Sequence, residues 1–174
     1  ACFLLRWQGV TLLVDPVFRK RMGGVARLLP LPRLQPIGRV DAVLITHGHM
    51  DHLDERSIRE TGTERILAPA KTADFLRRDL RPRCDRVALW DKRQIGPLRV
   101  EVTPAMHGGW RYPWQRGYVA CGYAISDGER TVFAAGDSAY GSHFGEIGNR
   151  WEIQAALLPI GAYAPVTSYR PVTS

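Results

Sequence analysis

One short stretch constrains this chain more than any other. Residues Thr46–Asp54, with the sequence THGHMDHLD, contain three histidines and two aspartates directly after the apolar run Val40–Ile45, which is typical of a buried strand. So many polar groups at a strand end compete for solvation and charge unless cations bind them, and imidazole and carboxylate suit Zn²⁺ or a similar first-row metal. His47 and His49 are two residues apart on an extended chain and can point to the same side. The stretch therefore predicts a metal-binding loop rather than a solvated polar loop.

Three other expected strand ends also carry polar side chains. Asp15 follows the run Val10–Val14, His107 follows the alternating run 98–104, and Asp137 follows the run 131–135 through Gly136. Asp15 has two roles that stay open: a turn residue that accepts a backbone hydrogen bond, or a carboxylate that orients a metal-binding histidine. A lone histidine is more often a surface or core residue, but His107 stands at a strand end before two glycines, which favours a ligand.

The pattern His47-x-His49-x-Asp51-His52 resembles the signature of the metallo-β-lactamase superfamily. Further segments resemble the branch that contains N-acyl-phosphatidylethanolamine-hydrolysing phospholipase D and its bacterial relatives: Asp15-Pro16-Val17-Phe18, His107, Gly136-Asp137-Ser138 and Leu158-Pro159-Ile160-Gly161-Ala162-Tyr163. The resemblance extends from about residue 3 to residue 165. It implies an α/β fold, the αββα four-layer sandwich, with a dinuclear metal site at one edge of two sheets.

The same resemblance implies a set of ligands. One Zn²⁺ is expected on His47, His49 and His107, and a second on Asp51 and His52, with Asp137 bridging the two; Mn or Fe are alternative metals. Asp51 and Asp137 are the expected catalytic carboxylates. Relatives supply one more histidine after the segment 158–163, but no histidine follows His143 here, so the C-terminal part of the fold is expected to be missing.

His143 itself is expected to be a surface histidine rather than a ligand, so its replacement by alanine should be almost silent. Asp137→Ala, in contrast, should lose nearly all activity.

The loop after His107 mixes aromatic rings with guanidinium groups: Trp110, Arg111, Trp114 and Arg116. Such a surface can bind phosphate through arginine while the rings contact apolar or sugar groups of a substrate. Packing of the loop over the edge of the sandwich is an equally good interpretation.

Size and composition bound the remaining possibilities. The 174 residues suit one domain, expected over residues 1–165, followed by an atypical tail, 166–174, in which Pro-Val-Thr-Ser occurs twice. The formal charge of +7 favours anionic partners electrostatically. Three scattered cysteines indicate no disulfide framework. A cytoplasmic location, with contact at a membrane surface as a further expectation, follows from these features, and the N-terminus, which lacks Met, is expected to be incomplete.

The local patterns also predict the order of elements. We expect a hairpin of strands 2–7 and 10–14, a long loop at 19–39, and then a βαβ alternation with strands at 40–45, 65–69 and 86–90 and helices at 55–60 and 72–80. A strand at 98–104, a second hairpin of strands 118–126 and 131–135, a helix that ends at about residue 150 and a last strand at 155–160 complete the order.

These features together predict a metal-dependent hydrolase that acts on a phosphodiester such as a phospholipid. A lactonase or other ester hydrolase and a metal-dependent nuclease are alternatives within the enzyme class, although no stable nucleic acid partner is expected. A non-catalytic metal-binding or anion-binding protein, or an inactive fragment, is the alternative outside it, because one ligand is missing.

Overall fold

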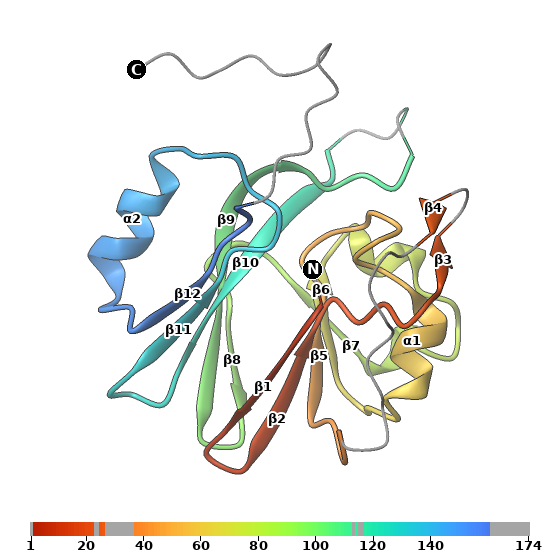
Figure 1. Cartoon of the computed structure of the whole chain (residues 1–174), viewed down its shortest axis with the longest axis horizontal. Coiled ribbons are helices and arrows are strands. Elements are labelled where there is room, and N and C mark those ends of the chain that lie inside the picture. Colours follow the sequence, from red (N-terminus) through yellow and green to blue (C-terminus); the bar gives the residue numbers. More distant parts are fainter. Residues whose placement is uncertain (1, 23–24, 27–36, 113, 115–116, 161–174) are drawn as a thin grey trace.

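The computed structural model describes residues 2–22, 25–26, 37–112, 114 and 117–160. Two five-stranded sheets face each other, with helix α1 (Glu55–Glu60) on the outer side of one and helix α2 (His143–Arg150) on the outer side of the other (Figure 1). This is the four-layer αββα sandwich that the sequence predicts. The predicted tail 166–174 lies outside the described residues.

The first sheet has the order β1-β2-β5-β6-β7, and its strands are β1 (Phe3–Trp7), β2 (Val10–Val14), β5 (Ala42–Leu44), β6 (Ile66–Pro69) and β7 (Cys84–Val87). β1 and β2 form the predicted antiparallel hairpin, and every other neighbouring pair is parallel. The side chains of β5 and β6 are all buried, as expected of parallel strands covered on both faces.

The second sheet has the order β12-β11-β10-β9-β8, with β8 (Lys92–Ile95), β9 (Leu98–Gly108), β10 (Val119–Ser126), β11 (Thr131–Ala134) and β12 (Ala155–Leu157). Its pairs are antiparallel except β11 with β12. A separate two-stranded hairpin, β3 (Arg21–Met22) with β4 (Val25–Ala26), lies in the segment predicted as a long loop.

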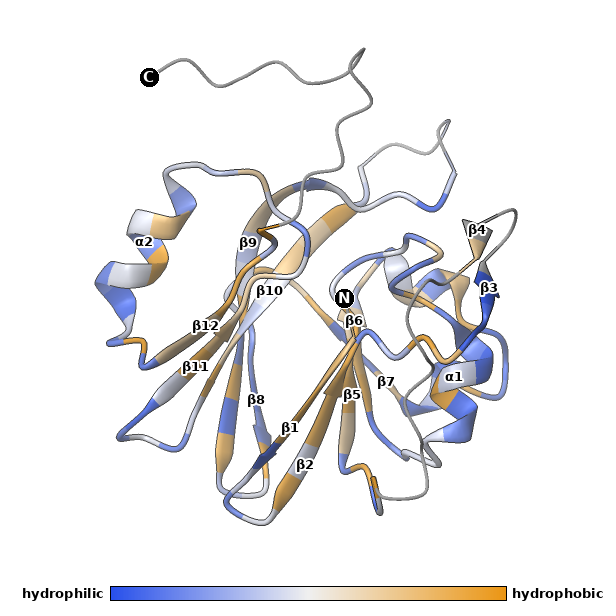
Figure 2. Cartoon of the chain, viewed as in Figure 1, coloured by the Kyte–Doolittle hydropathy of each residue, from blue (hydrophilic) through white to orange (hydrophobic). Residues whose placement is uncertain are grey.

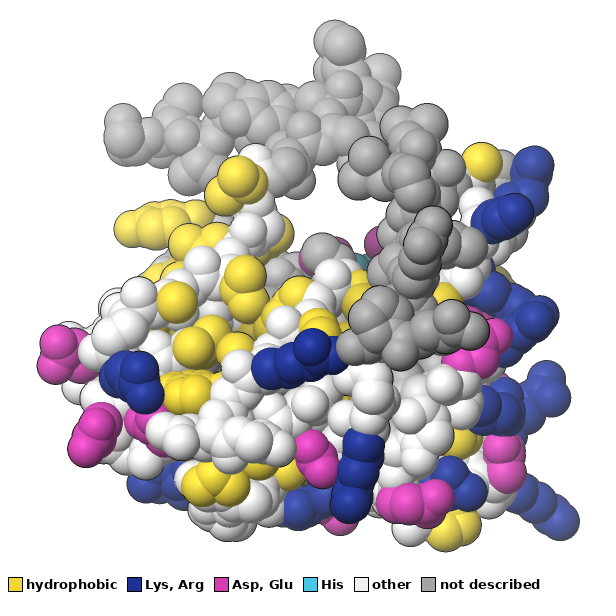
Figure 3. All heavy atoms as spheres, turned by 60° about the horizontal axis from the view of Figure 1, so that its bottom comes forward, with side chains coloured by type: hydrophobic (Ala, Val, Ile, Leu, Met, Phe, Trp, Pro, Cys, Tyr) yellow, Lys and Arg dark blue, Asp and Glu magenta, His cyan; other side chains and the backbone are white. Residues whose placement is uncertain are grey.

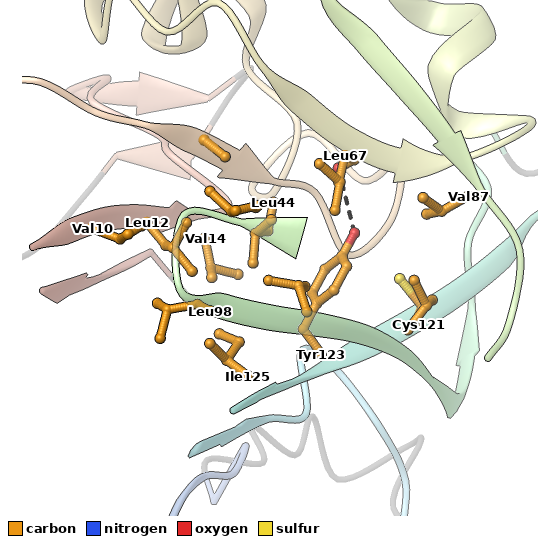
Figure 4. Packing of buried hydrophobic residues seen from close by; sticks show 14 residues of the cluster. Val10, Leu12, Val14, Leu44, Leu67, Val87, Leu98, Cys121, Tyr123 and Ile125 are labelled. Atoms are coloured by element: carbon orange, nitrogen blue, oxygen red, sulfur yellow. Dashed lines mark hydrogen bonds between the residues drawn. The ribbon is translucent and has the colours of Figure 1, made fainter. Parts of the chain in front are cut away.

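Alternation of side chains along the strands builds three apolar layers. Leu12, Leu44 and Tyr123 point between the sheets, where Tyr123 donates its hydroxyl to the carbonyls of Ile45 (2.6 Å) and Leu67 (3.4 Å; Figure 4). A second cluster packs the outer face of the first sheet against α1, and a third packs β11 against α2. Hydropathy follows this division, since the strands carry apolar residues and the solvent sides of both helices carry hydrophilic ones (Figure 2).

Two local predictions are wrong. The expected helix 72–80 is only a 3₁₀ turn at Thr72–Phe75, because Leu76 adopts extended backbone and buries its side chain, as does Leu80, in the cluster under α1. Tertiary packing overrides helix propensity here. Strand β8 was not predicted, although the two-residue connection Gly96-Pro97 before the alternating run 98–104 is a hairpin signal.

Candidate metal centre

The polar residues singled out in the sequence meet at one edge of the sandwich. Asp15 follows β2 and His47 follows β5, and these strands are parallel neighbours, so their carboxyl ends lie at the same edge. His107 lies near the end of β9, and Asp137 follows β11 in the facing sheet. A hydrogen bond from the Cys121 amide to the Thr46 carbonyl (3.0 Å) joins the two sheets at this edge.

Gly136 allows the Asp137 loop to approach the histidine loop. Its φ is +63°, a left-handed conformation that side chains disfavour. A Cβ atom there would also lie 2.9 Å from Thr46 Cγ2 and 3.0 Å from the Cys121 carbonyl. The glycine before Asp137 is therefore a geometric requirement of the site.

Three imidazole nitrogens converge in the first part of the cluster. His49 Nδ1 lies 3.0 Å from His47 Nε2 and 3.1 Å from His107 Nε2, and the three ligand atoms all lie within 4.8 Å of one another. Burial, followed by the neighbouring histidines, lowers the pKa of His47 to about 2; burial is also the main cause of the lowered pKa values of His49 and His107. The cluster therefore presents uncharged imidazoles, the form that binds a transition metal.

A second group shares His47 and adds His52 and Asp137, again with ligand atoms within 4.8 Å. His52 Nε2 lies 3.2 Å from Asp137 Oδ2. Burial lowers the pKa of His52, but hydrogen bonds with Asp137 and Asp15 outweigh this effect and raise the pKa to about 9. The hydrogen bond from His52 in turn holds the pKa of Asp137 well below its usual range. His52 and Asp137, together with His47, could hold a second cation.

Asp15 fixes the orientation of both loop histidines. Its Oδ2 accepts hydrogen bonds from His52 Nδ1 (2.8 Å) and from the Thr46 hydroxyl (2.6 Å), and its Oδ1 accepts the Thr46 amide (2.8 Å). Because the single Thr46 hydroxyl proton is donated to Asp15, the Thr46 oxygen must accept its 2.9 Å hydrogen bond from His47 Nδ1. Both histidines therefore carry a proton on Nδ1, and His47 offers the lone pair of Nε2 to the centre of the cluster. Such hydrogen bonds fix the tautomer of metal-binding histidines.

The donor set fits a pair of first-row cations. One group offers three nitrogens and the other two nitrogens and a carboxylate, a combination that suits Zn²⁺, Mn²⁺ or Fe²⁺. His49 Nε2 is buried without a hydrogen-bond partner among the described residues. The His49 ring is therefore held by the contacts of Nδ1 and by an edge-to-face contact with Trp110, in which the two ring centroids lie 4.7 Å apart.

The structure places the remaining predicted residues less centrally. The Asp51 side chain is 59% exposed, and its Oδ2 lies 3.7 Å from His52 Nε2, outside both convergent groups. The Arg111 guanidinium donates to the carbonyls of Gly48 (3.2 Å) and Leu53 (3.1 Å) and so braces the histidine loop. Trp114 is 76% exposed and stacks on Tyr112, whereas Arg116 lies outside the described residues.

His143 is not the surface histidine that the sequence suggested. It is buried (8% exposed), and its Nε2 lies 2.9 Å from the Ser138 hydroxyl. Ser138 also accepts the Met106 amide (3.0 Å) and donates to the Ala139 carbonyl (2.9 Å), so it links the residues next to His107 and Asp137. The polar residues that the sequence left unassigned are thus Thr46 and Ser138. Each stands next to a predicted ligand, which is a signal that could have found them.

Known proteins are similar to this chain in sequence and in fold. The chain is 32% identical to an uncharacterized protein of Mycobacterium tuberculosis over 173 residues, covering 92% of this chain and 46% of that protein. It is 30% identical to a metal-dependent hydrolase of Desulforamulus reducens, covering 92% and 69%. The chain therefore spans about half the length of the mycobacterial relative.

Solved structures agree on the fold. A metallo hydrolase from the archaeon Ignicoccus hospitalis has a TM-score of 0.73 at 24% identity, covering 93% of this chain and 68% of that one. An isothiocyanate hydrolase from Delia radicum gut bacteria has a TM-score of 0.66 at 22% identity, covering 90% and 67%. The sequence family described as "Beta-lactamase superfamily domain" matches residues 11–173, and the chain belongs to this family.

Proposed function

We propose that the chain carries the metal centre of a hydrolase that cleaves a phosphodiester bearing an apolar group. The observation that carries this proposal is the convergence of two ligand groups on a shared His47, each with its ligand atoms within 4.8 Å. The family membership and the hydrolases among the relatives support the reaction class.

His47, His49 and His107 would hold one cation, and His52 and Asp137 the other, with the exposed Asp51 carboxylate beside it. Cations held there would lower the pKa of bound water toward about 7 and polarise the bond under attack. Zn²⁺ is the proposed metal, because nitrogen donors prevail.

Other side chains of the chain would position the metal-binding histidines and transfer protons. Asp15 and Thr46 hold His52 and His47 in the tautomers described above, and Arg111 holds the loop between them. The Asp51 carboxylate is open to solvent and can accept a proton from water or pass one to the leaving group.

A groove beside the metal centre supports an apolar group on the substrate. Its volume is about 430 Å³, and it is lined by the carboxylates Asp15 and Asp137 together with apolar side chains that include Phe3, Leu157 and Ile160. Ligand sites with mostly apolar walls and a few polar groups bind amphiphilic molecules well. The positive net charge favours an anionic substrate. Figure 3 shows Lys and Arg side chains interspersed with Asp and Glu along the right-hand and lower margins of one face, with hydrophobic side chains nearer its centre.

Contact with a lipid surface is part of the same proposal. Large exposed side chains lie within or near the metal-binding segments along the chain: Met50 (46% exposed), Met106 (54%), Trp114 (76%) and Tyr140 (86%). Aromatic and thioether side chains of this kind suit an interface between water and lipid. None of the helices among the described residues is long and apolar enough to span a bilayer.

The test is hydrolysis by protein loaded separately with Zn²⁺, Mn²⁺ or Fe²⁺. Bis(p-nitrophenyl) phosphate, a phosphatidylcholine and p-nitrophenyl octanoate serve as substrates, with EDTA-treated protein and Asp137→Ala as negative controls. Asp79→Ala, which removes a 52% exposed carboxylate paired with Arg59, is the matched control. We expect phosphodiester turnover in wild type and Asp79→Ala alone.

Turnover of the carboxylic ester without turnover of either phosphodiester would refute the substrate class and favour an esterase. Stoichiometric metal binding without turnover of any substrate would refute the hydrolase and favour a metal-binding protein.

A further inference from the structure

A second cavity lies between the two sheets on the side of β7. Its volume is about 350 Å³, and the residues that line it come from the ends of β6 and β7, the turn after β7, and β9 and β10: Pro69, Lys71, Val87, Leu89, Val102 and Val119, with the Cys121 thiol and backbone of the intervening residues. None of the residues that line it is a predicted or observed member of the metal centre.

The floor of this cavity is rigid and apolar. Val87, Val102 and Cys121 are 2%, 1% and 1% exposed and belong to the core between the sheets. Figure 4 shows Val87 and Cys121 at one end of that core, on strands of different sheets. The Cys121 thiol donates to the Thr46 carbonyl (3.4 Å), and burial raises its pKa to about 12, so it contributes no charge.

Among the described residues, the mouth of the cavity is apolar apart from Lys71. Leu89 and Val119 are 40% and 46% exposed, so aliphatic side chains face solvent at the mouth. The Lys71 ammonium lies 5.6 Å from the centre of the Tyr118 ring, and a Cβ added to Gly117 would lie 2.6 Å from it, so it rests over the backbone at the mouth. Lys71 is the charged residue among those that line the cavity.

From this arrangement we infer that the cavity is a binding site for a straight-chain aliphatic monocarboxylate. The described residues that line the walls carry aliphatic groups and no aromatic ring, which suits an alkyl chain. The volume is at the lower end of the range for small-molecule sites, roughly 300–1,000 Å³, so one short chain fits and a diacyl lipid does not. The carboxylate pairs with Lys71 at the mouth, where a charged group keeps its contact with water.

The test is calorimetric titration of the metal-loaded protein with hexanoate, heptanoate and octanoate, and with octan-1-ol as the uncharged ligand. Binding requires no turnover, so its outcome is independent of the proposed hydrolase activity. We expect one saturable site per chain. Each added methylene should raise the affinity about fourfold, as expected for about 0.8 kcal/mol per buried methylene.

Two variants locate the site. Lys71→Gln should weaken octanoate binding about two- to fivefold, the range for a partly exposed ion pair, and leave octan-1-ol unchanged. Leu89→Trp should fill the mouth and weaken both ligands at least tenfold. Leu4→Trp is the matched control, because Leu4 is similarly exposed (37%) but does not line the cavity.

Absence of saturable binding, or binding that is insensitive to both Lys71→Gln and Leu89→Trp, would overturn the inference. So would a dimer in sedimentation experiments that Leu89→Trp dissociates and Leu4→Trp does not, because a second copy of the chain would then cover the mouth.

Discussion

Replacement of Asp15 is the most informative perturbation of the metal centre. The side chain is 1% exposed and accepts three hydrogen bonds, from the Thr46 amide, the Thr46 hydroxyl and His52 Nδ1, at 2.8, 2.6 and 2.8 Å. Asp15→Ala leaves all three buried donors unpaired. Each hydrogen bond to a charged group contributes roughly 1.5–3 kcal/mol, and such losses are not additive, so we expect the free energy of unfolding to fall by about 3–5 kcal/mol.

Asp15→Asn separates the effect on metal binding from the effect on folding. The amide has the shape of the carboxylate, but only its oxygen can accept hydrogen bonds, whereas both Oδ1 and Oδ2 of Asp15 accept them. If its oxygen faces the Thr46 amide, its NH₂ group faces His52 Nδ1 and the Thr46 hydroxyl. His52 must then accept at Nδ1 and carry its proton on Nε2, the atom next to Asp137. We expect the affinity of the His52 position for metal to fall about 10- to 100-fold, as is usual when such a partner is lost.

The assay is competition for Zn²⁺ with a chromophoric chelator, combined with elemental analysis and urea unfolding of the metal-free protein. Asp41→Asn is the matched control, since Asp41 Oδ2 accepts the Thr11 amide at 2.8 Å in the same sheet but does not contact the histidines. Two equivalents of Zn²⁺ bound by Asp15→Asn with wild-type affinity, or an equal loss in Asp41→Asn, would refute the proposed control of tautomers.

Three further predictions concern the same edge and the core beneath it. Asp137→Ala should abolish turnover, whereas His143→Ala, by releasing the Ser138 hydroxyl, should reduce it only partly; equal losses in steady-state assays would contradict this order. Metal-free protein should be most stable near pH 6.5, and urea midpoints should fall on both sides of this pH. The pKa of His52 is raised to about 9, so its contribution to stability is lost as the pH rises from 6.5 to 9. The pKa of His47 is lowered, so below pH 6.5 the unfolded chain binds a proton at His47 that the folded protein does not bind. Cys121, fully buried with its pKa raised to about 12, should react with a thiol reagent only after unfolding, and rapid labelling in the native state, measured by mass spectrometry of peptides, would be evidence against the packing.

The sequence by itself determined the class of fold, and five of the six residues that it predicts as metal ligands lie together in the structure, Asp51 being the exception. Density of histidine and aspartate at a strand end is a local signal, and His47, His49, His52, His107 and Asp137 converge as their positions at strand ends suggest. The hairpins are local as well, since two runs of alternating residues and a turn fix their register.

Only the tertiary structure decided how these groups are divided and oriented. Asp51, adjacent in sequence to His52, points toward solvent, whereas His47 belongs to both groups of ligands. The Thr46 hydroxyl accepts a hydrogen bond from His47 and donates one to Asp15. Thr46 and Asp15 are 31 positions apart, so no pattern within one segment reveals this connection. The extended backbone at Leu76, the burial of His143 and the cavity beside Lys71 likewise depend on which surfaces meet when the sheets pack. The physical reason is range: periodicity and turn chemistry act over a few residues, but burial and hydrogen-bond pairing are settled by neighbours that the chain brings together only when it folds.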